Sequence, residues 1–324
     1  MDHNLLEIKD LYVQYTADGR AVEAVNGITI TVKKGDTLGL VGETGAGKTT
    51  TALAIMGLVP DPPGKVTSGE ILLNGENLLQ KSAKDMRTIR GKDIAMIFQD
   101  PMTSLNPVLP VGDQIREVIL LHEKLSKTEA THKACQMLEL VGIPAERYDE
   151  YPHQFSGGMK QRVIIAIALA CNPKLLIADE PTTALDVTIQ AQVLEMMRDL
   201  KEKYGTAMIL ITHDLGVVAE VCNNVAIMNT GQIVESGTLD DIYSDPQHPY
   251  TIGLFRSIPD LTSKQRRLEI IPGIMPDPSN LPKGCNVCTR CQYATERCKQ
   301  EKPPVAQLSK SHAVLCWRNA EQEA

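Results

Sequence analysis

The first residues alternate between apolar and polar positions in the short rhythm of β-strands. The segment LLEIKDLYVQY at positions 5–15 predicts a half-buried strand, and ITITVKKGD at 28–36 predicts a second one that stops at Gly35. TLGLVG at 37–42 is instead a continuous apolar run, which is typical of a strand buried inside a parallel sheet. A glycine-rich turn follows, and then the helical pattern TTTALAIMGL at 49–58.

A second series of strands and helices follows later in the chain. LLIADE at 175–180 and AMILITHD at 207–214 predict two more buried strands, and the segment 182–205 between them predicts a helix closed by Gly205. Strands that alternate with helices predict a parallel α/β sheet. The residues at about 102–172 carry mostly helical periodicity, and we expect them to form an inserted helical subdomain.

The composition of the chain changes past Pro246, and we expect an α/β domain at 1–258 and a separate C-terminal region at 259–324. Five prolines lie between positions 259 and 283, which is typical of a linker laid over a surface. Five of the eight cysteines follow within the last 40 residues. In a reducing compartment, clustered cysteines are more often metal ligands than disulfides.

Composition narrows the class of protein. A chain of 324 residues with 43% hydrophobic and 23% charged residues is globular rather than disordered. The net charge of −7 and the 4% aromatic content argue against a nucleic-acid partner. The longest strongly apolar run, Val163–Cys171, is too short for a membrane span, which needs about 20 residues. The N-terminal segment has neither the basic nor the apolar part of a secretory signal, so we expect the cytoplasm as compartment.

The segment GETGAGKT at 42–49 fits the phosphate-binding pattern G-x-x-x-x-G-K-[ST] and lies between a buried strand and a helix, as that motif requires. Glycines let backbone N–H groups turn toward phosphates, and the helix start adds its positive end. We expect Lys48 to reach the β- and γ-phosphates and Thr49 to complete the shell of a Mg²⁺ ion. A glycine-rich turn that binds nothing is the alternative. The expected phosphate-binding residues are Gly42, Thr44, Gly45, Ala46, Gly47, Lys48, Thr49 and Thr50.

The strand at 175–180 ends in two acidic residues. We expect Asp179 to hold Mg²⁺ through water and Glu180 to polarise the attacking water. The alternative is a solvated strand end without a role. The apolar residues before Asp179 and the phosphate loop upstream favour the catalytic interpretation.

Residues 155–162, FSGGMKQR, resemble the LSGGQ signature of ATP-binding cassette (ABC) ATPases. Three other segments resemble motifs of the same family. Gln99 in IFQDP corresponds to the Q-loop, Ala184-Leu185-Asp186 to the D-loop, and His213 in ITHD to the switch histidine. The motifs occur in family order and with family-like spacing over residues 5–260.

This resemblance implies an α/β P-loop NTPase of ABC type that binds ATP and Mg²⁺ and hydrolyses ATP. It implies Lys48, Glu180 and His213 as catalytic residues. Gln99 would be a ligand of Mg²⁺ beside Thr49. An aromatic side chain on an early strand is expected to stack on adenine.

Tyr15 is our choice for the residue that stacks on adenine, and Tyr12 is the alternative. A tyrosine that only packs in its strand is the other interpretation. Arg20, in the turn ADGRAV, is placed to reach the nucleotide.

The signature segment predicts a helix start. Ser156 is a natural N-cap with two glycines behind it, so N–H groups face outward. In the resembled family this end binds the γ-phosphate held by the opposite subunit. Ser156 and Gly158 would therefore complete the partner's site, and a single subunit has only half a site. Phe155 and Met159 depart from the Leu and Gln of the general pattern, but neither change removes those N–H groups.

A narrower resemblance is to the oligopeptide/dipeptide importer ATPases. It is carried by IFQDPMTSLNP, FSGGMKQR, HPYT at 248–251 and the stretches IPG, MPDP and LPKGC, and it extends to about residue 316. It implies that the chain powers uptake of dipeptides or oligopeptides through two separate transmembrane permease subunits, as a peripheral protein on the cytoplasmic face of the membrane. The second ATPase would be a homologous subunit or another copy, and an extracytoplasmic peptide-binding protein would act indirectly. Nickel is the alternative cargo, since nickel importers share much of this pattern.

Two other classes fit less well. Soluble cassette proteins for DNA repair or translation usually carry two cassettes or a coiled-coil insertion, whereas this chain has one P-loop and one signature. A binding module with a dead site is disfavoured because Lys48, Glu180 and His213 are all present.

The late cysteines offer five thiols, and four thiolates suit either Zn²⁺ or an iron–sulfur cluster. Unligated cysteines in a tail are the plain alternative. The resemblance to peptide importers implies a small cysteine-rich metal-binding extension with a [4Fe–4S] cluster, and Zn²⁺ is the alternative metal. Cys288 would be spare, and His312 is expected at the surface. The implied ligands are Cys285, Cys291, Cys298 and Cys316.

Overall fold

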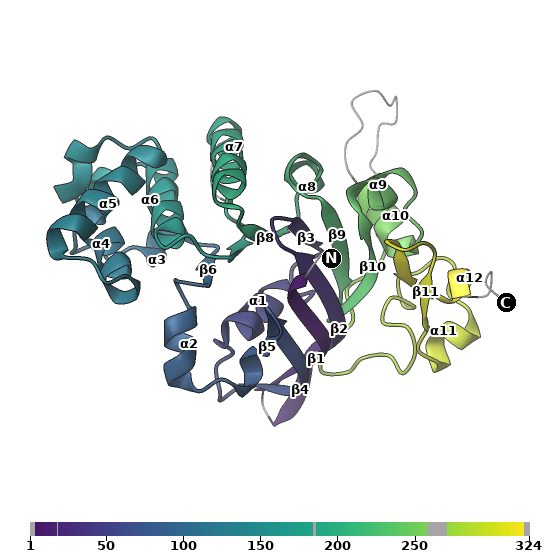
Figure 1. Cartoon of the computed structure of the whole chain (residues 1–324). Coiled ribbons are helices and arrows are strands. Elements are labelled where there is room, and N and C mark those ends of the chain that lie inside the picture. Colours follow the sequence, from purple (N-terminus) through teal and green to yellow (C-terminus); the bar gives the residue numbers. More distant parts are fainter. Residues whose placement is uncertain (1–3, 18, 184–185, 258–270, 321–324) are drawn as a thin grey trace. The chain divides into compact units, whose positions relative to one another are not determined.

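The computed structural model describes residues 4–17, 19–183, 186–257 and 271–320 of the chain (Figure 1). The chain forms two compact units. The first unit comprises Met1–Leu5, Val32–Thr37 and Leu73–Ile211, and the second comprises Leu6–Thr31, Leu38–Leu72 and Thr212–Ala324. Among the helices of the described residues, none is long and apolar enough to cross a membrane.

Parallel strands form the centre of the first unit. β7 (Leu175–Asp179) lies between β6 (Ile94–Ile97) and β8 (Ala207–Thr212), and both pairings are parallel. Every residue of β7 and β8 is buried, which is typical of strands covered on both faces. The parallel strands expected from the apolar runs LLIADE and AMILITHD are confirmed.

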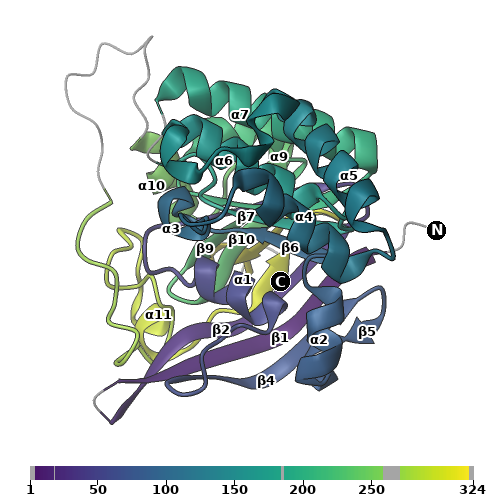
Figure 2. The same ribbon diagram turned by 90° about the vertical axis from the view of Figure 1, so that its left-hand side faces the viewer.

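Helices make up most of the residues between β6 and β7. α4 (Val111–His122) and α5 (Lys127–Leu140) pack on each other and on α6 (Gly157–Leu169), as Figure 2 shows. α6 also packs on β6. The other elements of this unit are β5 (Glu76–Asn77), α2 (Ala83–Ile89), α3 (Pro101–Ser104) and the 3-10 helices η1 (Leu78–Gln80), η2 (Ala145–Asp149) and η3 (Pro152–Gln154).

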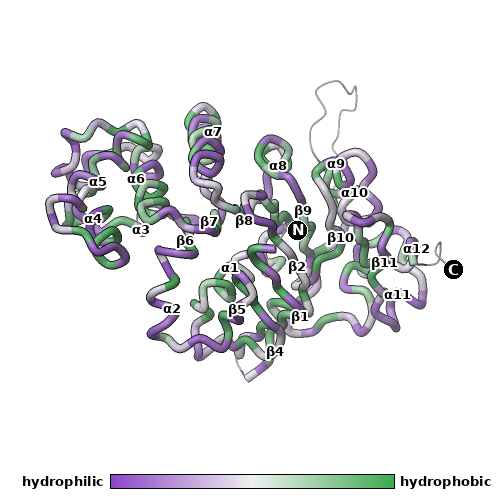
Figure 3. The backbone as a smooth tube through the Cα atoms, viewed as in Figure 1, coloured by the Kyte–Doolittle hydropathy of each residue, from purple (hydrophilic) through white to green (hydrophobic). Residues whose placement is uncertain are grey.

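α7 (Val187–Tyr204) packs on α6. The distribution of apolar residues along its sequence explains why this segment is helical. Hydrophobic and hydrophilic residues alternate along it in Figure 3, and its buried residues are Val193, Leu194, Met197 and Leu200. The helix begins later than the expected start at 182, because the Asp186 side chain accepts a hydrogen bond from Ile189 N and caps it. Gly205, with φ of 64°, closes it as expected.

The second unit contains two groups of paired strands. One has the order β2 (Arg20–Lys33), β1 (Asn4–Ala17), β4 (Gly64–Leu73). The other has the order β3 (Thr37–Val41), β9 (Asn224–Asn229), β10 (Gln232–Thr238), β12 (Ala313–Leu315), β11 (Val305–Gln307). β3 and β9 are parallel, and the remaining pairs of the second group are antiparallel. The helices are α1 (Lys48–Met56), α8 (Leu215–Val221), α9 (Leu239–Ser244), α10 (Pro249–Arg256), α11 (Glu296–Gln300) and α12 (Trp317–Ala320).

Candidate functional site

The phosphate loop joins β3 to α1, and its glycines are required by the backbone. Gly45 and Gly47 have φ of 83° and 102°, in the left-handed region that favours glycine. A Cβ at Gly42 would lie 2.1 Å from Met228 O, and one at Gly47 would lie 2.4 Å from Ala24 O. The sequence spacing of the motif therefore corresponds to positions where only glycine fits.

Lys48 is the first residue of α1 and is only 6% exposed. Its Nζ donates hydrogen bonds to Gly42 O at 2.7 Å and to Glu43 O at 3.0 Å. Thr44, Gly45 and Thr49 are exposed, so the loop opens to solvent next to the buried ammonium. This arrangement can receive an anionic ligand, because the helix start and the ammonium supply positive charge to the same loop.

In the first unit, the structure brings together two residues that the sequence separates widely. Gln99 Nε2 donates to Glu180 Oε2 at 2.7 Å, and Thr183 Oγ1 donates to the same oxygen at 3.0 Å. Glu180 has φ of 46°, which is uncommon for a residue with a side chain. Its N–H donates to Ile211 O at 2.9 Å, which holds this backbone conformation. The carboxylate is therefore oriented by two side-chain donors and by its own backbone.

Asp179 is the last residue of β7 and is 2% exposed. His213 is exposed and lies between β8 and α8, next to Asp214, whose side chain caps α8. Ala184 and Leu185 of the expected D-loop lie outside the described residues. The assigned roles of these residues stay predictions.

The signature segment forms the helix start that was expected. The Ser156 side chain is the N-cap of α6 and accepts a hydrogen bond from Met159 N at 3.4 Å. Gly158 lies close to α7, because a Cβ there would meet Ile189 Cγ2 at 2.5 Å. Phe155 is buried, and the Arg147 guanidinium lies over its ring at 4.2 Å. The departure at Phe155 therefore fills a packing position.

Each of the two tyrosines considered for adenine packs against a glycine. Tyr15 packs against Gly64, where a Cβ would meet the ring at 2.6 Å, and Tyr12 packs against Gly27 in the same way. Arg20 is exposed. Hydrogen bonds from Ser279 lower the pKa of Asp277, and the nearby charge of Arg20 lowers it further. The contact with adenine stays a prediction for Tyr15.

All five late cysteines line one cavity, together with apolar residues that include Val287 and Trp317. The backbone ties the cysteine segments together, since Cys285 N donates to Cys298 O at 2.8 Å. Cys288 lines the cavity like the other four, so its place outside a ligand set stays a prediction.

The side-chain positions of the described residues do not support the metal-binding extension expected at Cys285, Cys291, Cys298 and Cys316. Within residues 4–17, 19–183, 186–257 and 271–320, no three His, Cys, Asp or Glu side chains are grouped so as to hold a metal ion. Burial raises the pKa of the Cys285 thiol to about 12 and also raises the pKa of Cys291 and Cys316. Without a bound cation, these thiols stay protonated at neutral pH.

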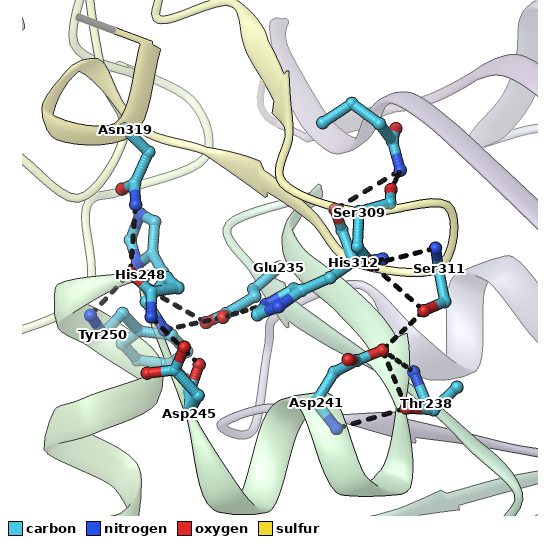
Figure 4. Close-up of polar contacts among 12 residues, drawn as sticks. Glu235, Thr238, Asp241, Asp245, His248, Tyr250, Ser309, Ser311, His312 and Asn319 are labelled. Carbon is cyan, nitrogen blue, oxygen red and sulfur yellow. Dashed lines mark hydrogen bonds and ion pairs between the residues drawn. The ribbon is translucent and has the colours of Figure 1, made fainter. Parts of the chain in front are cut away.

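The C-terminal region is attached to the sheet through a buried carboxylate (Figure 4). β12 pairs with β10, and Glu235 of β10 is 1% exposed. Its carboxylate accepts hydrogen bonds from His312 Nε2 at 2.8 Å, Gln247 N at 2.7 Å and His248 N at 3.0 Å. His312 was expected at the surface, and that expectation is wrong, since it is 5% exposed. It directly precedes β12, and the pairing of β12 with β10 brings it next to Glu235.

His248, in the same network, accepts a hydrogen bond from Tyr250 N on its Nδ1. Burial lowers the pKa of His248 to about 3, so its ring is neutral at physiological pH. The HPYT segment is thus part of the connection between α10 and β10.

Sequence reasoning missed Arg290, which contacts the phosphate loop. Its Nη1 and Nη2 donate to Glu43 Oε2 at 2.6 Å and Oε1 at 2.9 Å. The only signal in the sequence was a basic residue between Cys288 and Cys291.

Two family models match different parts of the chain. A family model described as "ABC transporter" matches residues 25–183, and one described as "Oligopeptide/dipeptide transporter, C-terminal region" matches residues 234–298. The ATP-binding cassette MJ0796, solved as a dimer in a post-hydrolysis state bound to ADP and Pi, is similar with a TM-score of 0.65 and 25% identity, over 72% of this chain and 98% of that chain. The fold and the matched motifs define an ABC-type ATPase with a P-loop NTPase domain.

Similar proteins over the full length narrow this class. The oligopeptide transport ATP-binding protein OppD of Bacillus subtilis (strain 168) is 54% identical over 97% of this chain and 88% of its own length. The dipeptide transport ATP-binding proteins DppD of the same organism and of Escherichia coli (strain K12) are 50% and 47% identical, over 97% and 96% of this chain and 94% and 96% of their own lengths. The chain therefore belongs to the oligopeptide and dipeptide transport ATP-binding proteins of the ABC family.

Proposed function

We propose that this chain is the ATP-hydrolysing subunit of an importer for dipeptides or oligopeptides, bound peripherally at the cytoplasmic face of the membrane. The main support for this proposal is the similarity to peptide transport ATP-binding proteins. It extends over 97% of this chain and includes the C-terminal region. Nickel as cargo is not favoured by these matches.

The phosphate loop supplies the binding half of the reaction. Lys48 would pair with the β- and γ-phosphates, giving up the hydrogen bonds that it now donates to Gly42 O and Glu43 O. Bound Mg²⁺ would neutralise charge on the phosphate oxygens. Thr49, Gln99 and Asp179 offer the hydroxyl, amide and carboxylate oxygens that this ion prefers.

Glu180 supplies the chemistry of hydrolysis. Its carboxylate would accept a proton from the attacking water, and Gln99 and Thr183 hold one of its oxygens in place. His213 would contact the γ-phosphate end of the nucleotide. Tyr15 would stack on adenine, with Arg20 nearby.

A second ATPase subunit would complete each site. The capped start of α6 presents exposed Ser156, with N–H groups behind it, which suits an anion bound by another chain. We propose a homologous subunit or a second copy as this partner. Two transmembrane permease subunits would couple hydrolysis to transport, and a peptide-binding protein would deliver cargo on the other side.

Uptake in a strain that lacks this chain tests the proposal. Accumulation of a labelled tripeptide should be lost and accumulation of labelled nickel should be retained. The wild-type chain should restore peptide uptake, and Glu180→Gln should not. Loss of nickel uptake with normal peptide uptake would contradict the proposed cargo.

We also propose a [4Fe–4S] cluster bound by Cys285, Cys291, Cys298 and Cys316. What supports it is that these four thiols line one cavity, and four thiolates are the usual ligands of such a cluster. The cluster would staple the C-terminal region, which has little apolar material of its own.

A further inference from the structure

The ion pair between Arg290 and Glu43 joins the phosphate loop to the cysteine region, residues 285–316, which contain the five late cysteines. It is bidentate, and the Arg290 side chain is 5% exposed against 31% for Glu43. Arg290 Nε also donates to Pro272 O at 3.1 Å. The guanidinium is therefore fixed by three hydrogen bonds and largely removed from water, where such a pair is stronger than at an open surface.

Every polar group of Glu43 makes a hydrogen bond, and its carbonyl oxygen connects it to the rest of the loop. Its N–H donates to the Tyr250 hydroxyl at 3.2 Å, and its carbonyl oxygen accepts from Lys48 Nζ at 3.0 Å and from Ala46 N at 3.1 Å. A displacement of the Glu43 side chain would therefore be transmitted to Lys48 and to the turn that follows.

A second connection from the cysteine region reaches the same loop. Asn286 Nδ2 donates to Thr230 O at 3.1 Å, and the next residue, Gly231, donates its N–H to Ala46 O at 2.9 Å. Asn286 is 3% exposed. The cysteine region thus supports the phosphate loop on both sides of its turn, at Glu43 and at Ala46.

The charge of Glu43 explains why such support is needed. The residue lies inside a loop that has to bind a triphosphate, and an unpaired carboxylate there would repel the ligand. Arg290 neutralises this carboxylate and holds it against the C-terminal region. A loop with a neutral residue at this position would need no such partner.

We infer that Arg290 is a positioning residue for nucleotide binding: it holds the Glu43 carboxylate against the C-terminal region and neutralises the charge that would otherwise repel the nucleotide. This inference rests on the proposed role of the loop as the ATP site. Arg290 acts through Glu43 and does not itself contact the nucleotide. The state of the C-terminal region therefore sets the affinity for ATP rather than the rate of hydrolysis.

The test measures the Kd for ATP of the full chain at equilibrium, with Arg290→Met, Glu43→Gln and the double variant. Arg290→Met should raise the Kd about tenfold, which corresponds to about 1.4 kcal/mol. The double variant should return to within about twofold of wild type, because the repelling charge is gone. The effect of Arg290→Met should also shrink at high salt, which a purely structural defect would not do.

Two controls separate this inference from simpler outcomes. Lys299→Ala removes an exposed ion pair with Glu296 in the same region and should leave the Kd unchanged. Lys48→Ala should abolish tight binding.

If Lys48→Ala binds like wild type, the proposed ATP site fails. If Lys48→Ala is defective but Arg290→Met binds like wild type, or the double variant stays as weak as Arg290→Met, the inference about Arg290 fails. Should Arg290→Met not fold, Arg290→Lys, which keeps the charge but loses the bidentate pair, is expected to raise the Kd by a smaller factor, and an unchanged Kd would equally contradict the inference.

Discussion

Gln99 donates its side-chain amide to the Glu180 carboxylate at 2.7 Å, although 81 residues separate them in the chain. Both lie in the first unit, Gln99 shortly after β6 and Glu180 directly after β7. Adjacent parallel strands end at the same edge of a sheet, so this contact follows from the pairing of β6 with β7. Through this contact, the Gln99 amide donates a hydrogen bond to Glu180, the residue that we propose as the base.

Glu180→Gln should retain ATP binding and lose steady-state turnover by about 10²–10⁴-fold, because it removes the proton acceptor and keeps the side-chain size. Measurement of kcat and of the Kd for ATP on the same preparation checks both halves. Lys48→Ala is the contrasting variant and should weaken binding itself. Turnover close to wild type in Glu180→Gln would show that another group is the base.

Ser156→Ala should destabilise the start of α6 by about 1 kcal/mol, since it removes the N-cap hydrogen bond to Met159 N. It should lower hydrolysis by the assembled pair without changing the affinity of the isolated chain for ATP. Ser82→Ala is a matched control, because Ser82 caps α2 in the same way and lies outside the signature. Weaker ATP binding by the isolated Ser156→Ala chain would contradict a role toward the partner's nucleotide.

Cys291→Ser should lose bound iron from anaerobically purified protein and make the C-terminal region more sensitive to protease. Wild type should be brown, with about four iron atoms per chain, as a four-thiolate cluster requires. Cys288→Ser should change little and serves as the control in the same cavity. Colourless protein with one zinc per chain would exclude the iron–sulfur cluster and leave a four-thiolate site.

His312→Ala should destabilise the protein by about 1–3 kcal/mol, because the buried Glu235 carboxylate loses one of its donors. A lowered Tm and faster proteolysis of the C-terminal region would report this loss. Ser311→Ala is the neighbouring control, since the hydroxyl of Ser311 binds Asp241 at an exposed position and its removal should cost little. Equal Tm values for the two variants would mean that the Glu235–His312 contact contributes no net stability.

Local pattern was sufficient for much of the fold and for part of the site. Continuous apolar runs identified β3, β7 and β8, because strands buried on both faces leave no polar alternation. The capped start at Ser156 and the glycines of the phosphate loop were also readable, since capping and left-handed backbone depend on a few adjacent residues.

Only the tertiary structure decided which distant residues meet. The sequence by itself determined a phosphate loop, a signature helix and a cluster of thiols, because each of these is a property of neighbouring positions. Nothing local indicates that Arg290 pairs with Glu43, or that β12 carries His312 to Glu235. Those contacts depend on how the C-terminal region packs in its unit. An ion pair between residues far apart in the chain produces no periodic sequence pattern, so it cannot be predicted from local positions.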